Sequence, residues 1–370
     1  MSWKKLRRTG VPADVCERLS KHNIHTCQDF LSLSSVELLR VTGKSYATVR
    51  QLARVVSQAC APRVITALEM RDRPMAAFFA TSLSALDRDL QGGIPCGSIT
   101  EVAGPSGCGK TQFCMMLSAL ATLPASLGGL DGGVIYIDTE SAFSAERLVE
   151  IARSRHPEHF CTDEHVIAMT NRVHVYRELT TQSVLSRLES LEEELIAKRV
   201  RLLVLDSVAS VLRKEIDLRF LAGVAERSEL LSHQAALLKY LAQEFSLPVV
   251  LTNQITTRFK GRSGSHAVNE GKTPGEKEMS GDGYVTAALG NTWSHCVNTR
   301  LILQYLDARR RQILIAKSPL ASFSGFVYSI QGSGLVLEDA ADAPTDALEG
   351  TDPGLQPIRV RTSLDCCFDI

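Results

Sequence analysis

The stretch SITEVAGPSGCGKTQFCMMLSAL, residues 98–120, carries the strongest structural signal in this sequence of 370 residues. An apolar run precedes, and an apolar helical stretch follows, the octapeptide Gly104-Pro105-Ser106-Gly107-Cys108-Gly109-Lys110-Thr111. The octapeptide fits the pattern G-x-x-x-x-G-K-[ST] in full. A strand before it and a helix after it form the setting in which this pattern is specific. Backbone N–H groups of such a loop surround phosphate groups, and the helix N-terminus adds positive potential.

All eight residues of this loop are therefore expected to bind ATP, with Mg²⁺ as the accompanying cofactor. Lys110 is expected to reach the β- and γ-phosphates, and the Thr111 hydroxyl to ligate the ion. A carboxylate must complete the metal site, and Asp206 follows the apolar run Leu202–Leu205. An aspartate at a strand end is often only a cap, but the distant phosphate loop requires such a partner. Asp206 is thus predicted to hold Mg²⁺ through its water shell.

Two further strand ends carry candidate catalytic groups. Asp138 and Glu140 follow the run Gly133–Ile137, and Gln254 follows the run Pro248–Thr252. A carboxylate beside a nucleotide can orient and deprotonate the attacking water. Glu140 is predicted to take this role because it lies just past the strand, whereas Asp138 is expected to be structural. The Gln254 amide is expected to sense the γ-phosphate and to transmit its presence to the following loop.

The fold class predicted for residues 81–337 is α/β with a mostly parallel sheet. From Thr81 onward, short apolar runs alternate with amphipathic helical stretches, which is the pattern of βαβ units. The strands are expected at Ser98–Ala103, Gly133–Ile137, Leu202–Leu205, Pro248–Thr252, Thr299–Gln304 and Gln312–Ala316. The helix before the third strand places four leucines on one face: Leu185, Leu188, Leu191 and Leu195.

Residues 1–58 are predicted to form a small all-α domain. Gly43 is placed to end one helix, and Ser45 to cap the next, as in a helix–hairpin–helix. Such a turn can direct backbone N–H groups at a phosphate. A plain four-helix packing module fits the same pattern. The basic cluster Lys4–Arg8 fits either a nuclear signal or a solvated face.

Three other segments are set apart by their composition. Residues 59–80 are punctuated by Pro62 and Pro74 and are predicted to be a linker with a short extended segment. Residues 258–283 are rich in Gly, Ser and charge and show no periodicity, so a long functional or disordered loop is expected. Residues 338–370 are acidic and are expected to be a disordered tail.

Composition and charge exclude several classes of protein. The chain has 41 basic and 41 acidic residues, so a strongly basic, histone-like binder and a globally acidic disordered chain are excluded. The charge is uneven, with a net of +6 in residues 1–62 and −6 in residues 338–370. Ten scattered cysteines lack zinc spacing, which favours a reducing compartment. No apolar run is long enough to span a membrane, and the first residues are not expected to be a signal peptide.

Together these motifs resemble the RecA/RadA family of strand-exchange ATPases, in particular the paralogues of the eukaryotic recombinase. The resemblance covers residues 81–335 in order and rests on LSALDRDLQGGIPCGSITEVAGPSGCGKTQFC, YIDTESAFSAERL, LLVLDSVAS, VVLTNQI, LGNTWSHCVNTRLIL and IAKSP. It implies a RecA-like ATPase core and a nuclear factor of homologous recombination. It also implies a heteromeric complex containing the C paralogue directly and the D and X paralogues through it. Such a complex would bind single-stranded or branched DNA and support the main recombinase at double-strand breaks and stalled forks.

The resemblance also implies roles for individual residues. Lys110, Thr111, Asp206, Glu140 and Gln254 match the family's ATPase core, and Arg147 matches a residue that packs on adenine. Residues 213–229 correspond to a first DNA-facing loop and residues 258–286 to a second. The DNA-binding candidates in these loops are Arg213, Lys214, Arg219, Arg258, Lys260 and Arg262. The charge of the second loop is nearly balanced, so only modest DNA binding by the chain alone is expected. A surface loop without a DNA role fits as well.

Two departures from the family concern assembly. The recombinase polymerises through F-x-x-A, and the aligned segment here is Val64-Ile-Thr-Ala67. The family's Asp-Ser-Pro cap over a neighbour's ATP is replaced by Lys317-Ser318-Pro319. Both changes oppose self-assembly and favour a hetero-oligomer with weak hydrolysis. The alternatives are a scaffold with a structural nucleotide, and another ATPase class such as a hexameric helicase or circadian-type kinase.

Overall fold

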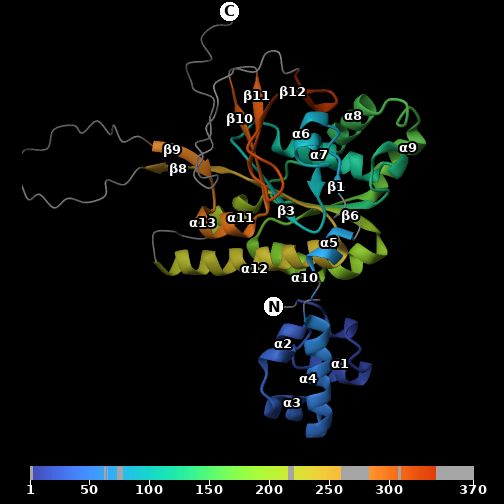
Figure 1. The fold of residues 1–370 in the computed structure, drawn as a ribbon, viewed down its shortest axis with the longest axis vertical. Helices are drawn as coiled ribbons and strands as arrows, with labels where there is room; N and C mark the ends of the chain where they lie inside the picture. Colours follow the sequence, from blue (N-terminus) through green and yellow to red (C-terminus); the bar gives the residue numbers. More distant parts are fainter. Residues whose placement is uncertain are drawn as a thin grey trace, which may run out of the picture. The chain divides into compact units, whose positions relative to one another are not determined.

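The computed structural model describes residues 3–61, 64, 66–72, 78–215, 221–259, 283–306 and 310–338. The chain divides into two compact units, residues 1–75 and residues 76–370 (Figure 1).

The first unit is a bundle of short helices. It contains the 3₁₀ turn η1 (Leu6–Arg8) and the helices α1 (Ala13–Ser20), α2 (Cys27–Ser32), α3 (Ser35–Thr42) and α4 (Tyr46–Cys60). Gly43 ends α3 with φ 62°, a left-handed conformation that glycine adopts without strain. The Ser45 side chain accepts a hydrogen bond from the Thr48 N–H and so caps α4. The predicted helix end at Gly43 and the cap at Ser45 are confirmed.

The segment predicted as a linker contains a helix that the sequence analysis missed. Helix α5 (Ala67–Asp72) follows Thr66, whose side chain accepts from the Glu69 N–H while the Glu69 carboxylate accepts from the Thr66 N–H. This reciprocal capping explains a local helix despite the nearby prolines. The short extended segment is β1 (Phe78–Phe79), which pairs with β2 (Ile94–Pro95) in the second unit.

The second unit is built on a nine-stranded sheet in the order β13-β12-β11-β10-β3-β7-β6-β4-β5. Its strands are β3 (Ile99–Ala103), β4 (Gly133–Asp138), β5 (Val173–Arg177), β6 (Val200–Asp206), β7 (Val249–Asn253), β10 (Thr299–Tyr305), β11 (Arg311–Lys317), β12 (Gly325–Gln331) and β13 (Gly334–Leu337). Strands β10, β3, β7, β6, β4 and β5 are parallel, and β11 to β13 are antiparallel. All six predicted strands are present, and the mostly parallel α/β fold is confirmed.

Helices pack on the sheet and connect its strands (Figure 1). They are α6 (Ser84–Asp89), α7 (Lys110–Thr122), η2 (Ala125–Leu127), α8 (Ala145–Arg155), α9 (Asp163–Arg172), α10 (Thr181–Ala197), α11 (Val208–Glu215), α12 (Leu221–Phe245) and α13 (Gly290–Cys296). The predicted leucine face of α10 is buried. Helix α7 is buried along most of its length, which fixes the end of the phosphate-loop segment inside the core.

A buried ion pair joins β3 to β10 below the phosphate loop. The Arg300 Nε donates to Glu101 Oε2 at 2.5 Å, and both side chains are almost fully buried. The Trp293 indole and the Asn253 amide donate to the other Glu101 oxygen at 2.8 and 2.6 Å. These contacts satisfy a charge that would otherwise be costly to bury, and they fix α13 against the central strands.

Both segments expected to face DNA contain parts of regular elements. Residues 213–229 fall largely in α11 and α12, with residues 216–220 between these helices outside the described ranges. The second segment is bounded by an antiparallel hairpin of β8 (Ile255–Phe259) and β9 (Gly283–Ala287). The prediction of a structureless loop was therefore wrong at its ends, where the strands pair locally; residues 260–282 lie outside the described residues.

The described helices include none that is both long and apolar enough to cross a membrane.

Candidate nucleotide site

A cavity of about 570 Å³ lies where the parallel strands β3, β4 and β6 end. In an open α/β sheet this carboxyl edge is where ligands bind. The cavity is lined by phosphate-loop residues, two strand-end carboxylates and four residues from elsewhere: Ser106, Gly107, Gly109, Lys110, Thr111, Glu140, Asp206, Gln112, Ala142, Arg147 and Ile330. Most of the predicted nucleotide residues are thus brought to one cavity.

The phosphate loop is held from behind by the C-terminal strands. Three consecutive loop carbonyls accept hydrogen bonds from Tyr305 Oη, Arg311 Nε and Tyr328 Oη; the carbonyls belong to Ser106, Gly107 and Cys108. A loop whose carbonyls are fixed on one side can present its N–H groups on the other. The sequence analysis missed these three donors because no local motif links them to a loop about 200 residues earlier.

Lys110 folds back onto the loop that it follows. Its ammonium donates to the carbonyls of Gly104 and Pro105, both at 2.9 Å. Burial lowers the pKa of this ammonium, and the carboxylates of Asp206 and Glu140 oppose that shift. A partly buried cation with nearby carboxylates and carbonyls is suited to receive anionic phosphates.

Asp206 is the centre of a buried hydroxyl cluster. One carboxylate oxygen accepts from Thr111 Oγ1 and Tyr136 Oη, each at 2.7 Å, and the other accepts from Thr252 Oγ1. Burial raises the pKa of this carboxyl, while these three hydrogen bonds lower it. The carboxylate and the Thr111 hydroxyl are hard oxygen donors at the cavity wall, so the residues present fit a Mg²⁺ ion.

Glu140 lines the cavity with an exposed side chain and is hydrogen-bonded to Gln254, which is not one of the lining residues. The Glu140 Oε1 atom accepts from Gln254 Nε2 at 2.7 Å and from Ser207 Oγ at 2.6 Å. Asp138 lies apart from this pair, since its carboxylate accepts from the backbone N–H groups of residues 140, 142 and 143. Asp138 therefore shapes the turn that carries Glu140, as its structural role requires.

Arg147 lines the cavity from α8 and is held in place by several acceptors. Its Nε donates to Gln112 Oε1 at 2.7 Å, and its terminal nitrogens donate to the carbonyls of Gln331 and Gly332 at 2.6 and 3.2 Å. Glu150 forms an ion pair with it at 2.7 Å. The guanidinium is thus oriented before any ligand arrives.

The candidates for DNA binding and assembly come from other segments of the chain. Arg213 and Lys214 belong to α11 and Arg258 to β8, whereas Arg219, Lys260 and Arg262 lie outside the described residues. Val64 is 97% exposed, and Ala67 begins α5. The Lys317 ammonium donates to the carbonyls of Ser294 and Val297, at the C-terminus of α13. A cation at that end of a helix is favourable, so Lys317 has a partner within its own chain.

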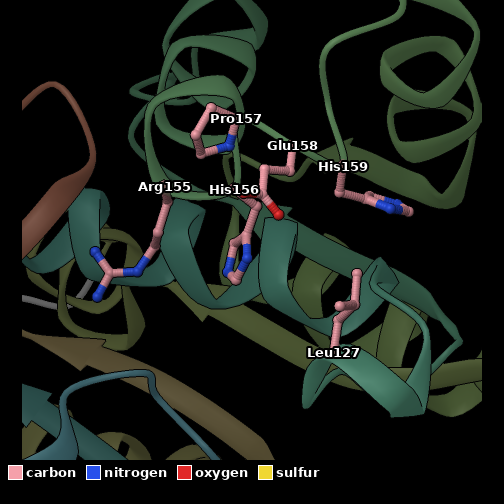
Figure 2. Close-up of a pocket in the computed structure, with 6 residues that line it drawn as sticks. All are labelled: Leu127, Arg155, His156, Pro157, Glu158 and His159. Carbon is pink, nitrogen blue, oxygen red and sulfur yellow. The ribbon is translucent and has the colours of Figure 1, made fainter.

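A second cavity, of about 440 Å³, lies at the C-terminus of α8 (Figure 2). It is lined by Leu127, Arg155, His156, Pro157, Glu158 and His159. None of these residues lines the nucleotide cavity, and none was predicted as a site residue.

The strand order and the cavity define a RecA-like P-loop nucleotide-binding protein with a helix–hairpin–helix unit. Residues 73–339 match the Rad51 family, and residues 6–60 match the XRCC3/RpoA-like helix-hairpin-helix domain. The chain belongs to the Rad51 family, whose members are generally ATPases that use a nucleotide and Mg²⁺.

Within this family the chain is similar to the B paralogue, as SAFSAERL and LGNTWSHCVNTRLILQYLD indicate. It is 59% identical to the mouse DNA repair protein RAD51 homolog 2 over 345 residues, covering 91% of this chain and 99% of that protein. The human protein of the same name is 58% identical over 92% of this chain and 90% of its own length. The Arabidopsis thaliana protein of that name is 31% identical over 99% of this chain and 98% of its own length. The chain is thus a recombination and repair paralogue of the Rad51 family.

Proposed function

We propose that the chain is an ATP-hydrolysing mediator of homologous recombination that works in a heteromeric complex of recombinase paralogues. The observation that carries the proposal is the meeting of Glu140 and Gln254 beside a complete phosphate loop. A chain that used its nucleotide only as structural support would not need a carboxylate that lines the cavity and is hydrogen-bonded to a side-chain amide.

The chemistry expected of this pair is general-base catalysis with a sensor. Glu140 Oε1 has two donors, so Glu140 is held at the cavity rim with its carboxylate positioned to accept a proton from an attacking water. Mg²⁺, when bound at Thr111 and Asp206, would neutralise charge on the phosphates. Lys110 would exchange its loop carbonyls for phosphate oxygens.

Gln254 provides a route from the nucleotide to the second loop. The backbone carbonyl of Gln254 accepts a hydrogen bond from the N–H of Ala288, the residue directly after β9, at 2.8 Å. If the Gln254 side-chain amide turns from Glu140 to a γ-phosphate, this hydrogen bond would transmit the movement to the base of the β8–β9 hairpin. The basic candidates Arg258, Lys260 and Arg262 would then contact single-stranded or branched DNA, with Arg213, Lys214 and Arg219 contributing from the first loop.

The proposed partners and location follow from the family. The relatives are named as DNA repair proteins, which supports a nuclear protein acting on breaks and stalled forks. The C paralogue is the proposed direct partner, with D and X joined through it, and the main recombinase is the protein that the complex loads or stabilises. Val64, Ala67 and Lys317 are the proposed determinants of pairing with a paralogue rather than with a second copy.

ATP turnover by the chain, alone and co-purified with the C paralogue, tests this proposal. Turnover should be weak alone and rise with the partner and single-stranded DNA. Lys110→Ala should weaken ATP binding and so lower turnover, because a charge-assisted phosphate contact worth about 1.5–3 kcal/mol is lost. Lys21→Ala, on the exposed surface of the helical unit, is the matched control. Tight ATP binding without turnover in any of these mixtures would instead support a scaffold whose nucleotide is structural.

A further inference from the structure

Helix α8 holds the turn of the β12–β13 hairpin through two arginines, eight residues apart. Arg147 donates to the carbonyls of Gln331 and Gly332. Arg155, the last residue of α8, donates through Nη1 to the carbonyls of Ser333 and Leu335 at 2.8 and 2.9 Å. Four carbonyls at this end of the hairpin, within residues 331–335, therefore accept hydrogen bonds from one helix.

The same hairpin forms the wall behind the phosphate loop. A Cβ added at Gly109 would lie 2.8 Å from Ile330 Cδ1 and 3.6 Å from Leu335 Cδ1, so these two side chains pack directly on that glycine. Tyr328 donates to the Cys108 carbonyl, and Ile330 also lines the nucleotide cavity. A shift of the hairpin would therefore shift the surface on which the loop rests.

Arg155 has a second set of partners at the start of the ATPase unit. Its Nε donates to Ser82 Oγ at 2.6 Å, and Nη2 donates to the Ser82 carbonyl at 3.2 Å. Ser82 follows β1 and Thr81, and Thr81 is fixed by two hydrogen bonds to Asp87 of α6. Figure 2 shows the Arg155 side chain pointing away from the His159 side chain, although both residues line the same cavity.

A guanidinium can serve both sets of partners at once because its donors form a planar fork. Burial lowers the pKa of Arg155, with the Asp87 carboxylate opposing that shift, yet an arginine stays charged in proteins. The residue is thus a cation enclosed by four neutral acceptors on two segments about 250 residues apart in sequence. Arg155 belongs to none of the nucleotide-binding motifs of the sequence.

We propose that Arg155 is a positioning residue for the nucleotide cavity: it holds the β12–β13 turn against the phosphate loop and ties that turn to Ser82 at the root of the linker. This inference rests on the proposed nucleotide function. Because coupling between two sites is reciprocal, a partner that moves the linker root would change ATP affinity, and ATP would change the partner's affinity.

The test compares substitutions at two arginines of the same helix. Arg155→Met removes the fork, and Arg155→Lys keeps the charge with fewer donors. Arg153→Met is the matched control, because Arg153 forms an ion pair with Asp163 and both side chains are largely exposed. Equilibrium ATP binding and amide hydrogen exchange are measured on the full chain. Arg155→Met is expected to weaken ATP binding about tenfold, or ~1.4 kcal/mol, with Arg155→Lys between it and the wild type. Arg153→Met should stay within about twofold of the wild type.

Hydrogen exchange separates this positioning role from general destabilisation. Arg155→Met should speed exchange in residues 331–337 and 80–83 while β4 and β6 keep their protection. Ser82→Ala should speed exchange mainly in residues 80–83. Wild-type ATP affinity in a folded Arg155→Met chain would overturn the proposal, and so would unchanged exchange at the turn. If the wild type bound no ATP, the proposed function would fail, and the exchange result would still decide whether Arg155 holds the turn.

Discussion

Glu140 is held at the cavity by two neighbours that both donate to the same carboxylate oxygen, Oε1. Within the described part of the chain, Oε2 accepts no hydrogen bond. A carboxylate fixed through one oxygen keeps the other for a water molecule. The residue type and its place past β4 were predictable from sequence, but Ser207 as a second support was not, because it belongs to another strand end.

Glu140→Gln should keep ATP binding and lower hydrolysis by about 10²–10⁴-fold, the contribution of a positioned general base. An amide of the same shape cannot accept the proton. Single-turnover hydrolysis with the co-purified partner is the measurement, and Glu158→Gln, exposed near the end of α8, is the control. Equal rates in Glu140→Gln and the wild type would remove Glu140 from this role.

Tyr328→Phe should weaken ATP binding by about fivefold, or ~1 kcal/mol, without abolishing it. The phenol donates to the Cys108 carbonyl, and the fully buried ring leaves no room for water to replace it. Isothermal titration with ATP measures the change. Tyr46→Phe, at a tyrosine that is 57% exposed on α4, should leave affinity unaltered. The idea that loop carbonyls are held from behind fails if both variants bind like the wild type.

At the scale of helices and strands, the sequence predicted elements whose pattern is local and missed those defined by their neighbours. The six predicted strands are apolar runs bounded by turn residues, and β3 is buried along its whole length. Strand β5 reads VHVYR and is only half-buried, so its pattern is weak. Strands β12 and β13 include polar and glycine residues and are defined by pairing with each other. In the candidate site, the phosphate loop was predictable from motif spacing, whereas Tyr305, Arg311 and Tyr328 were not.

Ser45→Ala should lower the stability of α4 by about 1 kcal/mol, because the Thr48 N–H loses its acceptor. Hydrogen exchange of the α4 amides in the full chain measures this. Ser57→Ala makes the same change within α4, at an exposed position away from the cap, and should have a smaller effect. Equal effects of the two substitutions would mean that Ser45 contributes helix propensity and not capping.

Neutralising Arg258, Lys260 and Arg262 together should lower both DNA affinity and its salt dependence. Each phosphate contact to a single strand contributes about 0.7 to the slope of log affinity against log salt, so loss of three lowers it by roughly 2. Fluorescence anisotropy with single-stranded DNA across a salt series is the measurement. The control replaces Arg199 and Arg201, which are exposed beside the first residues of β6. An unchanged slope in the triple variant would exclude the second loop as the contact.

At the scale of the whole molecule, the features proposed to govern assembly are those where the chain departs from the family's sequence motifs. Val64 stands in place of an aromatic anchor and is almost fully exposed. Full burial of a Phe-sized side chain is worth about 1.5–3 kcal/mol per joint, and a filament repeats that loss at every joint. Lys317 is engaged by the end of α13 and carries a charge opposite to the family's cap.

The purified chain should therefore be monomeric or poorly behaved alone and stable when co-expressed with the C paralogue. A single interface can form with a partner whose pocket fits a small anchor residue, whereas a filament of identical chains cannot. Size-exclusion chromatography with light scattering, with and without ATP and DNA, measures this. Val64→Phe, which restores the family's aromatic residue, should increase self-association. Long regular filaments of the unaltered chain would refute the prediction.

The anchoring of the phosphate loop by late strands has a consequence for synthesis on the ribosome. Strand β3 pairs with β7 and β10, and the loop's carbonyl partners lie 199, 204 and 220 residues further along the chain. A nascent chain therefore displays its nucleotide motif long before it has the strands that give the motif its shape. ATP binding that depends on these contacts can begin only after β12 and β13 have been synthesised. Termination before β12 and β13 would leave a product that carries the whole octapeptide yet cannot use it.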